Sequence, residues 1–229
     1  MERKSNEDIK REDLLLLILI LGSIWGFSEV VVSGIISSVG IPYRAAILTG
    51  VGMCLMGIGV GLFRKPLLLP AIAFITILCK QMVVPILGVS VICKANSCLA
   101  VLIEGAMLGA VVAIGGKTIR RGAPHQLMTG FSAGFLSAIP FYFIGLKVAP
   151  CQYLLSFNHP GGLLSFLINE ALMWGVFSGI LFSLGFWVGG RLRITSLSFK
   201  TTKPAMYYGF STMLVVFCWV VSGIFISSH

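Results

Sequence analysis

Three glutamates are the residues of this chain best suited to do chemistry. After Asp13 the only carboxylates are Glu29, Glu104 and Glu170, and each lies in a long apolar run with a glycine five residues later. A charged side chain at the centre of a bilayer costs about 3 kcal/mol on insertion scales, so ionisable residues in such positions usually serve a function. These carboxylates could bind a cation or an amine, or act as an acid and base pair.

The composition identifies the class of protein in which these glutamates lie. The 229-residue chain is 57% hydrophobic and only 11% charged, whereas charged residues make up about 25% of a soluble domain. It is therefore an integral membrane protein with no room for a soluble catalytic domain. The predicted fold class is an all-α polytopic bundle, because a helix satisfies its own backbone hydrogen bonds in hydrocarbon and the alternating pattern of barrel strands is missing.

The expected organisation is a charged cytoplasmic tail over residues 1–13 and a single transmembrane domain of six or seven helices over residues 14–229. A spanning helix needs about 20 apolar residues. Seven segments meet this length, at roughly 14–38, 43–63, 66–88, 97–116, 126–148, 162–189 and 205–227. Pro85 could break the third. The first is too long for a signal-peptide core and lacks a cleavage site, so we expect it in the mature protein.

The distribution of basic residues predicts the orientation. With the N-terminus inside, thirteen lysines and arginines fall on the inner side and only Arg44, Lys94 and Lys147 on the outer side. Positive charge accumulates on the cytoplasmic side, so we expect a multi-pass protein of the inner or plasma membrane with a cytoplasmic N-terminus. The same asymmetry explains the net charge of +9 and indicates contact with anionic lipid rather than nucleic acid.

Helix rise predicts that four ionisable residues share one depth. At 1.5 Å per residue, Glu29 and Lys80 lie about 21 to 22 Å above the inner end of their helices, and Glu104 and Glu170 roughly 10 to 12 Å below the outer end of theirs. This convergence favours a substrate-binding pocket open to the outside. The polar residues expected to support it are Gln81, Asn96 and Asn169. The alternative is structural: Lys80 neutralises one glutamate as a buried pair, and the other two are protonated because burial favours the neutral form of a carboxyl group.

Three carboxylates and one lysine predict a pocket of net negative charge. Such a pocket suits a cationic, amine-bearing or zwitterionic solute. Aromatic side chains near the outer ends could stack on that solute, although tyrosine and tryptophan are also common at membrane interfaces. These residues are Trp25, Tyr43, Tyr142, Tyr153 and Trp174.

Two segments carry a resemblance to a known family. Residues 22–29 (GSIWGFSE) and 96–105 (NSCLAVLIEG), in a compact bundle with short loops, resemble the substrate-binding S component of energy-coupling-factor transporters. The resemblance implies capture of a vitamin, vitamin precursor or metal from outside, with a separate transmembrane coupling subunit and paired ATPases as partners. It also implies that Gly22 and Gly26 contact the coupling subunit. The chain departs from the family in using glycine instead of alanine there, in having a seventh segment, and in lacking an N-terminal histidine motif.

Two other functions stay open from the sequence. A stand-alone carrier would use the glutamates as proton or cation sites, and an intramembrane enzyme would use them as acid and base. The chain has none of the nucleophile or metal motifs of membrane hydrolases, such as His-Glu-x-x-His or Gly-x-Ser-x-Gly. No cofactor or resident metal is expected. Two of the outer cysteines Cys93, Cys98 and Cys151 could pair if their compartment is oxidising.

Overall fold

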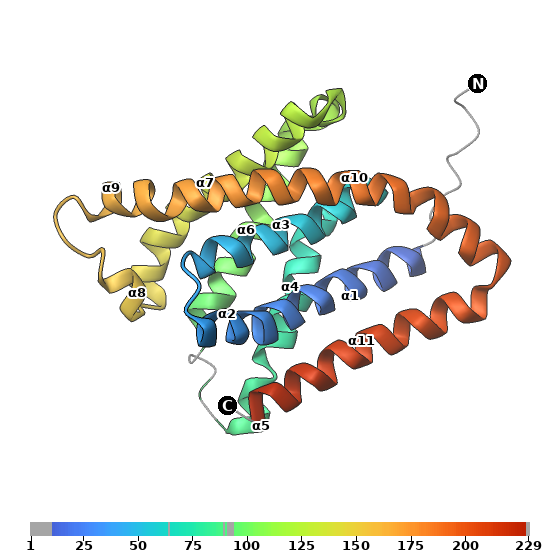
Figure 1. Ribbon diagram of the computed structural model, residues 1–229, viewed down its shortest axis with the longest axis horizontal. Helices are drawn as coiled ribbons and strands as arrows, with labels where there is room; N and C mark the ends of the chain where they lie inside the picture. Colours follow the sequence, from blue (N-terminus) through green and yellow to red (C-terminus); the bar gives the residue numbers. More distant parts are fainter. Residues whose placement is uncertain (1–10, 64, 89, 91–93, 228–229) are drawn as a thin grey trace.

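The computed structural model describes residues 11–63, 65–88, 90 and 94–227. Within these residues every regular element is a helix, and Figure 1 shows the helices as one bundle. Seven segments are long and apolar enough to cross a membrane: Glu12–Val39, Arg44–Phe63, Leu68–Leu87, Ala95–Arg121, Ala123–Val148, Gly162–Leu192 and Pro204–Ile226. The expected all-α bundle is confirmed, and the seventh predicted segment is also long and apolar enough to cross a membrane. Residues 1–10 of the predicted tail lie outside the described residues.

The first span contains a π-helical turn. It is composed of α1 (Arg11–Phe27), the π-helix η1 (Ser28–Val32) and α2 (Ser33–Val39). Gly40 ends it in the left-handed conformation with φ 73°, and the Ile41 amide donates a 3.2 Å hydrogen bond to the Ile36 carbonyl. This Schellman arrangement favours glycine, which has no Cβ to clash. The turn returns the chain directly into the second span, α3 (Arg44–Phe63).

The third span is broken, as the sequence suggested. It is composed of α4 (Leu68–Gln81) and α5 (Val83–Leu87), separated at Met82. Pro85 has no amide proton to donate to the Gln81 carbonyl four residues earlier, and its ring crowds that carbonyl, which favours a break there.

The other elements follow in chain order and end in two long helices. They are α6 (Ala95–Gly115), the 3-10 helix η3 (Gly116–Arg121), α7 (Ala123–Val148), α8 (Gln152–Leu155), α9 (Gly162–Phe166), the π-helix η4 (Leu167–Ala171), α10 (Leu172–Thr202) and α11 (Pro204–Ser227). Pro204 disfavours a helical conformation in Lys203. The chain therefore turns sharply between α10 and α11 (Figure 1).

The closest helix packing joins α3 to α10, which share the most extensive contact in the bundle. A Cβ added to Gly57 would lie 2.7 Å from the Phe182 carbonyl oxygen, and one added to Gly185 would overlap the Cys54 carbonyl oxygen. Lipid provides no hydrophobic force between helices, so the close backbone approach that glycine permits supplies the packing.

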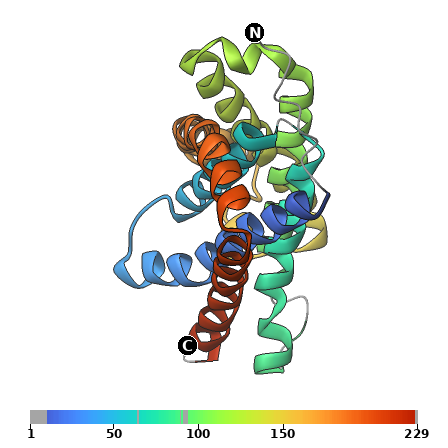
Figure 2. The ribbon, with the colours of Figure 1, turned by 90° about the vertical axis from the view of Figure 1, so that its right-hand side faces the viewer.

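The last helix, α11, packs chiefly against α1. Trp219 Nε1 donates a 2.8 Å hydrogen bond to Ser23 Oγ, and the Tyr208 hydroxyl donates one of 3.3 Å to Asp13. Figure 2, turned by 90° from Figure 1, again shows the C-terminal end of α11 beside α5. This packing brings Phe225, near the end of α11, to the cavity described next.

Candidate functional site

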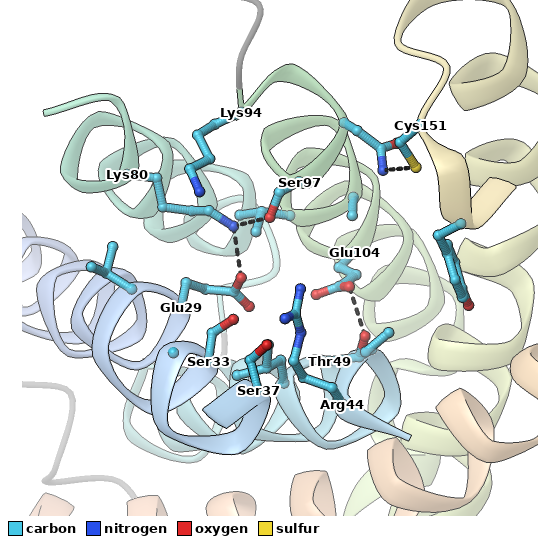
Figure 3. Close-up of a pocket in the computed structure, with 18 of the residues that line it drawn as sticks. Glu29, Ser33, Ser37, Arg44, Thr49, Lys80, Lys94, Ser97, Glu104 and Cys151 are labelled. Carbon is cyan, nitrogen blue, oxygen red and sulfur yellow. Dashed lines mark hydrogen bonds and ion pairs between the residues drawn. The ribbon is translucent and has the colours of Figure 1, made fainter. Parts of the chain in front are cut away.

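A cavity of about 1000 Å³ opens at the end of the bundle that the sequence predicts to face outward. Its wall includes Ser37, Arg44, Lys94 and Cys151, which lie at helix ends or connections on that side. The volume is at the upper end of the range of ligand pockets, about 300–1,000 Å³. Figure 3 shows side chains from several helices converging on its centre.

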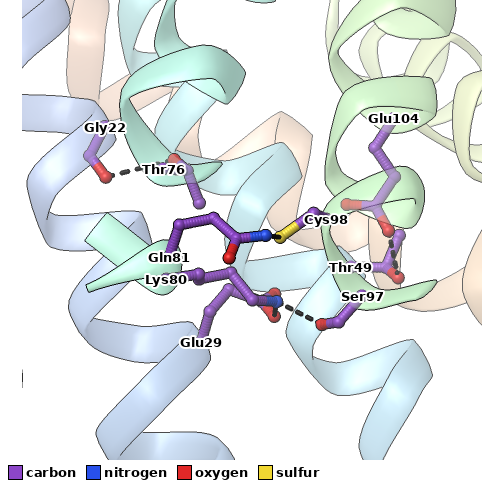
Figure 4. Close-up of polar contacts among 9 residues, drawn as sticks. All are labelled: Gly22, Glu29, Thr49, Thr76, Lys80, Gln81, Ser97, Cys98 and Glu104. Atoms are coloured by element: carbon purple, nitrogen blue, oxygen red, sulfur yellow. Dashed lines mark hydrogen bonds and ion pairs between the residues drawn. The ribbon is translucent and has the colours of Figure 1, made fainter. Parts of the chain in front are cut away.

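Glu29 and Lys80 form a buried ion pair in the cavity wall. Lys80 Nζ lies 2.7 Å from Glu29 Oε2, and the two side chains are 4% and 8% exposed. The ammonium also donates to Ser97 Oγ on α6, so it links η1, α4 and α6 (Figures 3 and 4). The structural alternative considered above therefore applies to Glu29. Among the described residues, neither Glu104 nor Glu170 has a basic nitrogen within ion-pair distance.

Glu104 is the most deeply buried of the three glutamates, with 3% of the residue exposed. Thr49 Oγ1 on α3 donates a 2.9 Å hydrogen bond to its Oε1. Its Oε2 has no hydrogen-bond partner in the described part of the chain. A buried acceptor without a donor loses its hydration and gains nothing in return, at a cost of about 1 to 3 kcal/mol or more for a charged group. A ligand that donates to Oε2 would remove that cost.

Glu170 approaches the same cavity from the sixth span, beside Tyr153 of α8. Burial, and after it the nearby Glu170 carboxylate, raise the pKa of Tyr153. The Tyr153 hydroxyl thus keeps its proton and can donate a hydrogen bond. The Glu170 carboxylate is the acceptor nearest in its effect on this hydroxyl, but no hydrogen bond of ordinary length and angle joins it to a described residue.

Two of the three glutamates lie in π-helical turns. Glu29 is in η1 and Glu170 is in η4. A π-turn adds one residue to an α-helix and so changes the direction of the side chains around it; such turns are frequent at functional sites. Neither turn contains glycine or proline, and the apolar pattern runs through both. The sequence therefore offered no local signal for them.

Half of the buried, unpartnered polar side-chain atoms in the described residues belong to this one cavity. Four of the eight are on lining residues: Asn96 Oδ1, Glu104 Oε2, the Tyr153 hydroxyl and Trp174 Nε1. Buried polar groups in native proteins nearly always have a partner. The set includes a donor, the indole nitrogen, and acceptors, the amide and carboxylate oxygens. The wall therefore presents unused hydrogen-bonding groups of both kinds.

The three supporting residues predicted from the sequence have different positions. Asn96 lines the cavity and donates a 2.9 Å hydrogen bond to Cys151 Sγ. Gln81 is not part of the wall and instead donates to Cys98 Sγ at 3.3 Å (Figure 4). Asn169 is exposed and bonds within its own helix segment. Five of the seven predicted binding residues thus meet at the cavity: Glu29, Lys80, Asn96, Glu104 and Glu170.

Two basic residues of the cavity were missed from the sequence. Arg44 and Lys94 line it together with Lys80, so three basic side chains accompany the three carboxylates. The prediction of a net negative pocket is therefore corrected to one of balanced charge. A signal was present: Arg44 and Lys94 are two of only three basic residues on the sparsely charged outer side, the other being Lys147.

Aromatic and hydroxyl side chains complete the wall. Of the five aromatic residues considered from the sequence, Tyr43, Tyr153 and Trp174 line the cavity, whereas Trp25 and Tyr142 do not. The hydroxyls come from Ser33, Ser37, Thr49 and Ser97. Serine and threonine are common in membrane helices as packing and hydrogen-bonding residues, so their sequence positions alone did not indicate a site.

Gly22 and Gly26, which the resemblance assigned to a partner contact, lie in the packing between α1 and α4. A Cβ added to Gly22 would lie 2.5 Å from Ile75 Cβ, and one added to Gly26 would lie 2.5 Å from Cys79 Cβ. Thr76 Oγ1 also donates a 3.1 Å hydrogen bond to the Gly22 carbonyl (Figure 4). Both glycines are buried. The structure therefore gives them an internal packing role, with α4 covering the face expected for a partner.

The cysteines and possible metal ligands contribute little to the cavity. Cys98 and Cys151 are free thiols, and Cys93 lies outside the described residues. Among the described residues, no group of three or more histidine, cysteine or acidic residues is placed to hold a metal ion.

Comparisons with protein-family models, with curated proteins and with solved structures find no match to this chain. The resemblance to S components thus rests on sequence features alone.

Proposed function

We propose that this chain captures a small polar solute from the extracytoplasmic side of the membrane for uptake, in the manner of an S component of energy-coupling-factor transporters. The observation that carries the proposal is the cavity wall, which holds four of the eight buried and unpartnered polar side-chain atoms of the described residues. Buried polar groups in native proteins nearly always have a partner, so unused ones around a cavity of ligand size support a binding site.

The chemistry of the wall favours an organic solute over a bare metal ion. Glu104 and Glu170 offer acceptors to an amine or another N–H group, whereas the Trp174 indole can only donate. A bare cation would satisfy the carboxylates and leave the indole without a partner. Among the classes that the resemblance implies, a vitamin or vitamin precursor with cationic or zwitterionic character fits this set.

The partners follow from the same proposal. An S component binds its solute alone but needs a transmembrane coupling subunit and a pair of ATPases for sustained uptake. The unpaired, buried Glu104 also supports a second candidate, a stand-alone carrier coupled to protons or cations. Proteoliposomes containing only this chain distinguish the two. Uptake driven by an ion gradient would support the carrier, whereas binding without net uptake would support the S component.

The decisive experiment is mass spectrometry of small molecules that co-purify with the protein. We expect a compound that is present in the wild type and reduced about tenfold or more in Glu104→Gln and Glu170→Gln, because each substitution removes a charged acceptor. Asn169→Ala is the matched control, since Asn169 adjoins Glu170 but is exposed and outside the wall. Equal content in all four proteins, or no bound compound in the wild type, would refute the binding function.

A further inference from the structure

We infer that the solute carries an anionic group as well as an N–H donor, with Arg44 and Lys94 binding the anion near the mouth and Glu104 binding the donor farther in. This inference rests on the proposed function and narrows its substrate class. It rests on the charge pairing in the wall, the direction of Arg44 and the distance between the two ends of the cavity.

The charges of the wall are only partly paired with one another. Lys80 is neutralised by Glu29 at 2.7 Å, which leaves two basic and two acidic residues. Among the described residues, neither Arg44 nor Lys94 takes part in an ion pair or a side-chain hydrogen bond. A cavity that bound only a cation would gain nothing from two additional positive charges, which would repel it. Their presence fits a ligand with a negative group.

Arg44 extends into the cavity from the start of α3, directly after a backbone position with an unusual conformation. It is the first residue of α3, and Tyr43 before it has φ 57°, the only positive φ of a non-glycine residue among those described. This conformation is uncommon outside glycine and marks strain that is often found at ligand sites. Figure 3 shows the Arg44 side chain extending toward the space between Glu29 and Glu104. Its planar guanidinium can bind a carboxylate or phosphate with two parallel hydrogen bonds.

The two ends of the site are far enough apart for an organic molecule. Lys94 immediately precedes α6, and Glu104 lies ten residues farther along, about 15 Å of helix rise. On α3, Thr49, which holds Glu104, lies five residues after Arg44, about 7.5 Å of rise. The arginine and lysine side chains shorten these separations by reaching inward. A bare metal ion finds no lone pair on either basic group, whereas an organic molecule with both an anionic group and an N–H donor can contact the basic groups and Glu104 together.

Aromatic residues of the wall indicate what lies between the two charged groups. Phe141 and Trp174 both line the cavity, are 3% and 2% exposed, and have ring centroids 5.3 Å apart. Their ring planes are tilted by 35° to each other, and they give the wall an apolar part between the charged groups. The ligand class assigned by the wall is an organic acid with an apolar portion that also carries an amine or amide N–H.

The test is equilibrium dialysis of the purified full-length protein against the small-molecule fraction of a yeast extract, with mass spectrometry of the enriched compounds. The variants are Arg44→Gln, Lys94→Gln and Glu104→Gln. Lys147→Gln is the matched control, because Lys147 is an exposed basic residue of the same outer side that does not line the cavity. Size-exclusion chromatography of each variant shows that it is folded. The Kd of the main enriched compound is then compared with that of its methyl ester, which lacks the negative charge.

The wild type is expected to enrich an acid with an N–H donor, and Arg44→Gln and esterification should each weaken its binding about tenfold. Their effects should not add, because both remove the same contact. Enrichment of compounds without an acidic group, or an acid whose binding is unchanged in Arg44→Gln, overturns this inference and leaves the proposed function standing. A wild type that enriches nothing beyond Glu104→Gln overturns both.

Discussion

Thr49 on α3 donates a 2.9 Å hydrogen bond to Oε1 of Glu104 on α6, while Oε2 of the same carboxylate has no partner among the described residues. One oxygen therefore holds the side chain in place, and the other is free to accept a hydrogen bond. A carboxylate that served only to join two helices would be expected to use both oxygens, because a half-satisfied buried group is destabilising.

Thr49→Val should weaken both the fold and the site. Valine has a similar shape but no hydroxyl, so Oε1 loses its donor and the protein should lose about 1 to 3 kcal/mol of stability. Thermal unfolding in detergent measures the loss, and dialysis binding should weaken in parallel. Thr49→Ser keeps the hydroxyl and should behave like the wild type. If valine is tolerated with no change in either measurement, Thr49 does not position Glu104.

The Glu29–Lys80 pair should show strong coupling in a double-mutant cycle. Glu29→Gln or Lys80→Met alone leaves one buried charge without its partner and should cost about 3 to 5 kcal/mol. The double variant should recover much of that loss, because no uncompensated charge is left. Unfolding in increasing concentrations of denaturant gives the free energy of unfolding of the wild type, the two single variants and the double variant. Additive single effects would mean that the two groups do not interact as the 2.7 Å contact indicates.

Removing the extra residue of η4 should abolish binding without unfolding the protein. Deletion of Ile168, whose side chain is 57% exposed, restores an α-helical register on both sides of the turn. The side chain of Glu170 then points roughly 100° away from its present direction relative to the cavity, which is the rotation that one residue contributes to an α-helix. We expect the deletion variant to fold but to enrich no solute. Ile168→Ala, which keeps the number of residues in the turn, should both fold and bind the solute. A deletion variant that still binds would show that the π-turn does not direct Glu170.

Gly22→Leu should destabilise the monomer itself. The new side chain would collide with Ile75 on α4, and helix packing in lipid depends on such close approach. Gly209→Leu is the control, because a Cβ there meets nothing within 4 Å. The two variants are distinguished by their expression level and by the amount of monomer that detergent extracts from the membrane. A stable, monodisperse Gly22→Leu that fails only to assemble with other subunits would restore the partner contact expected from the resemblance.

Tyr153 should make stability fall at alkaline pH. Its pKa in the folded protein is raised above the ordinary value of 10.0, mainly by burial. The folded state therefore holds the proton more tightly than the unfolded chain, so this contribution is complete below about pH 10 and is lost as pH rises further. Melting temperatures of the wild type should drop more steeply above pH 10 than those of Tyr153→Phe. Parallel curves for the two proteins would exclude this linkage.

Composition and helix geometry alone predicted much of the fold and part of the site. The apolar content required helices, because membrane backbone must bond to itself, and the seven spans agree with the predicted segments. Helix rise grouped Glu29, Lys80, Glu104 and Glu170, and all four line one cavity. These features depend on periodicity and length, which a sequence states directly.

Only the tertiary structure decided which polar groups pair and which stay unused. The π-turns under Glu29 and Glu170 leave no trace in residue type, because they depend on how neighbouring helices pack. The pairing of Lys80 with Glu29 and the cover that α4 places over Gly22 come from contacts between residues far apart in the chain. The sequence alone predicts the depth at which a charged side chain lies in the membrane. Which group pairs with that side chain depends on the angle at which two helices meet.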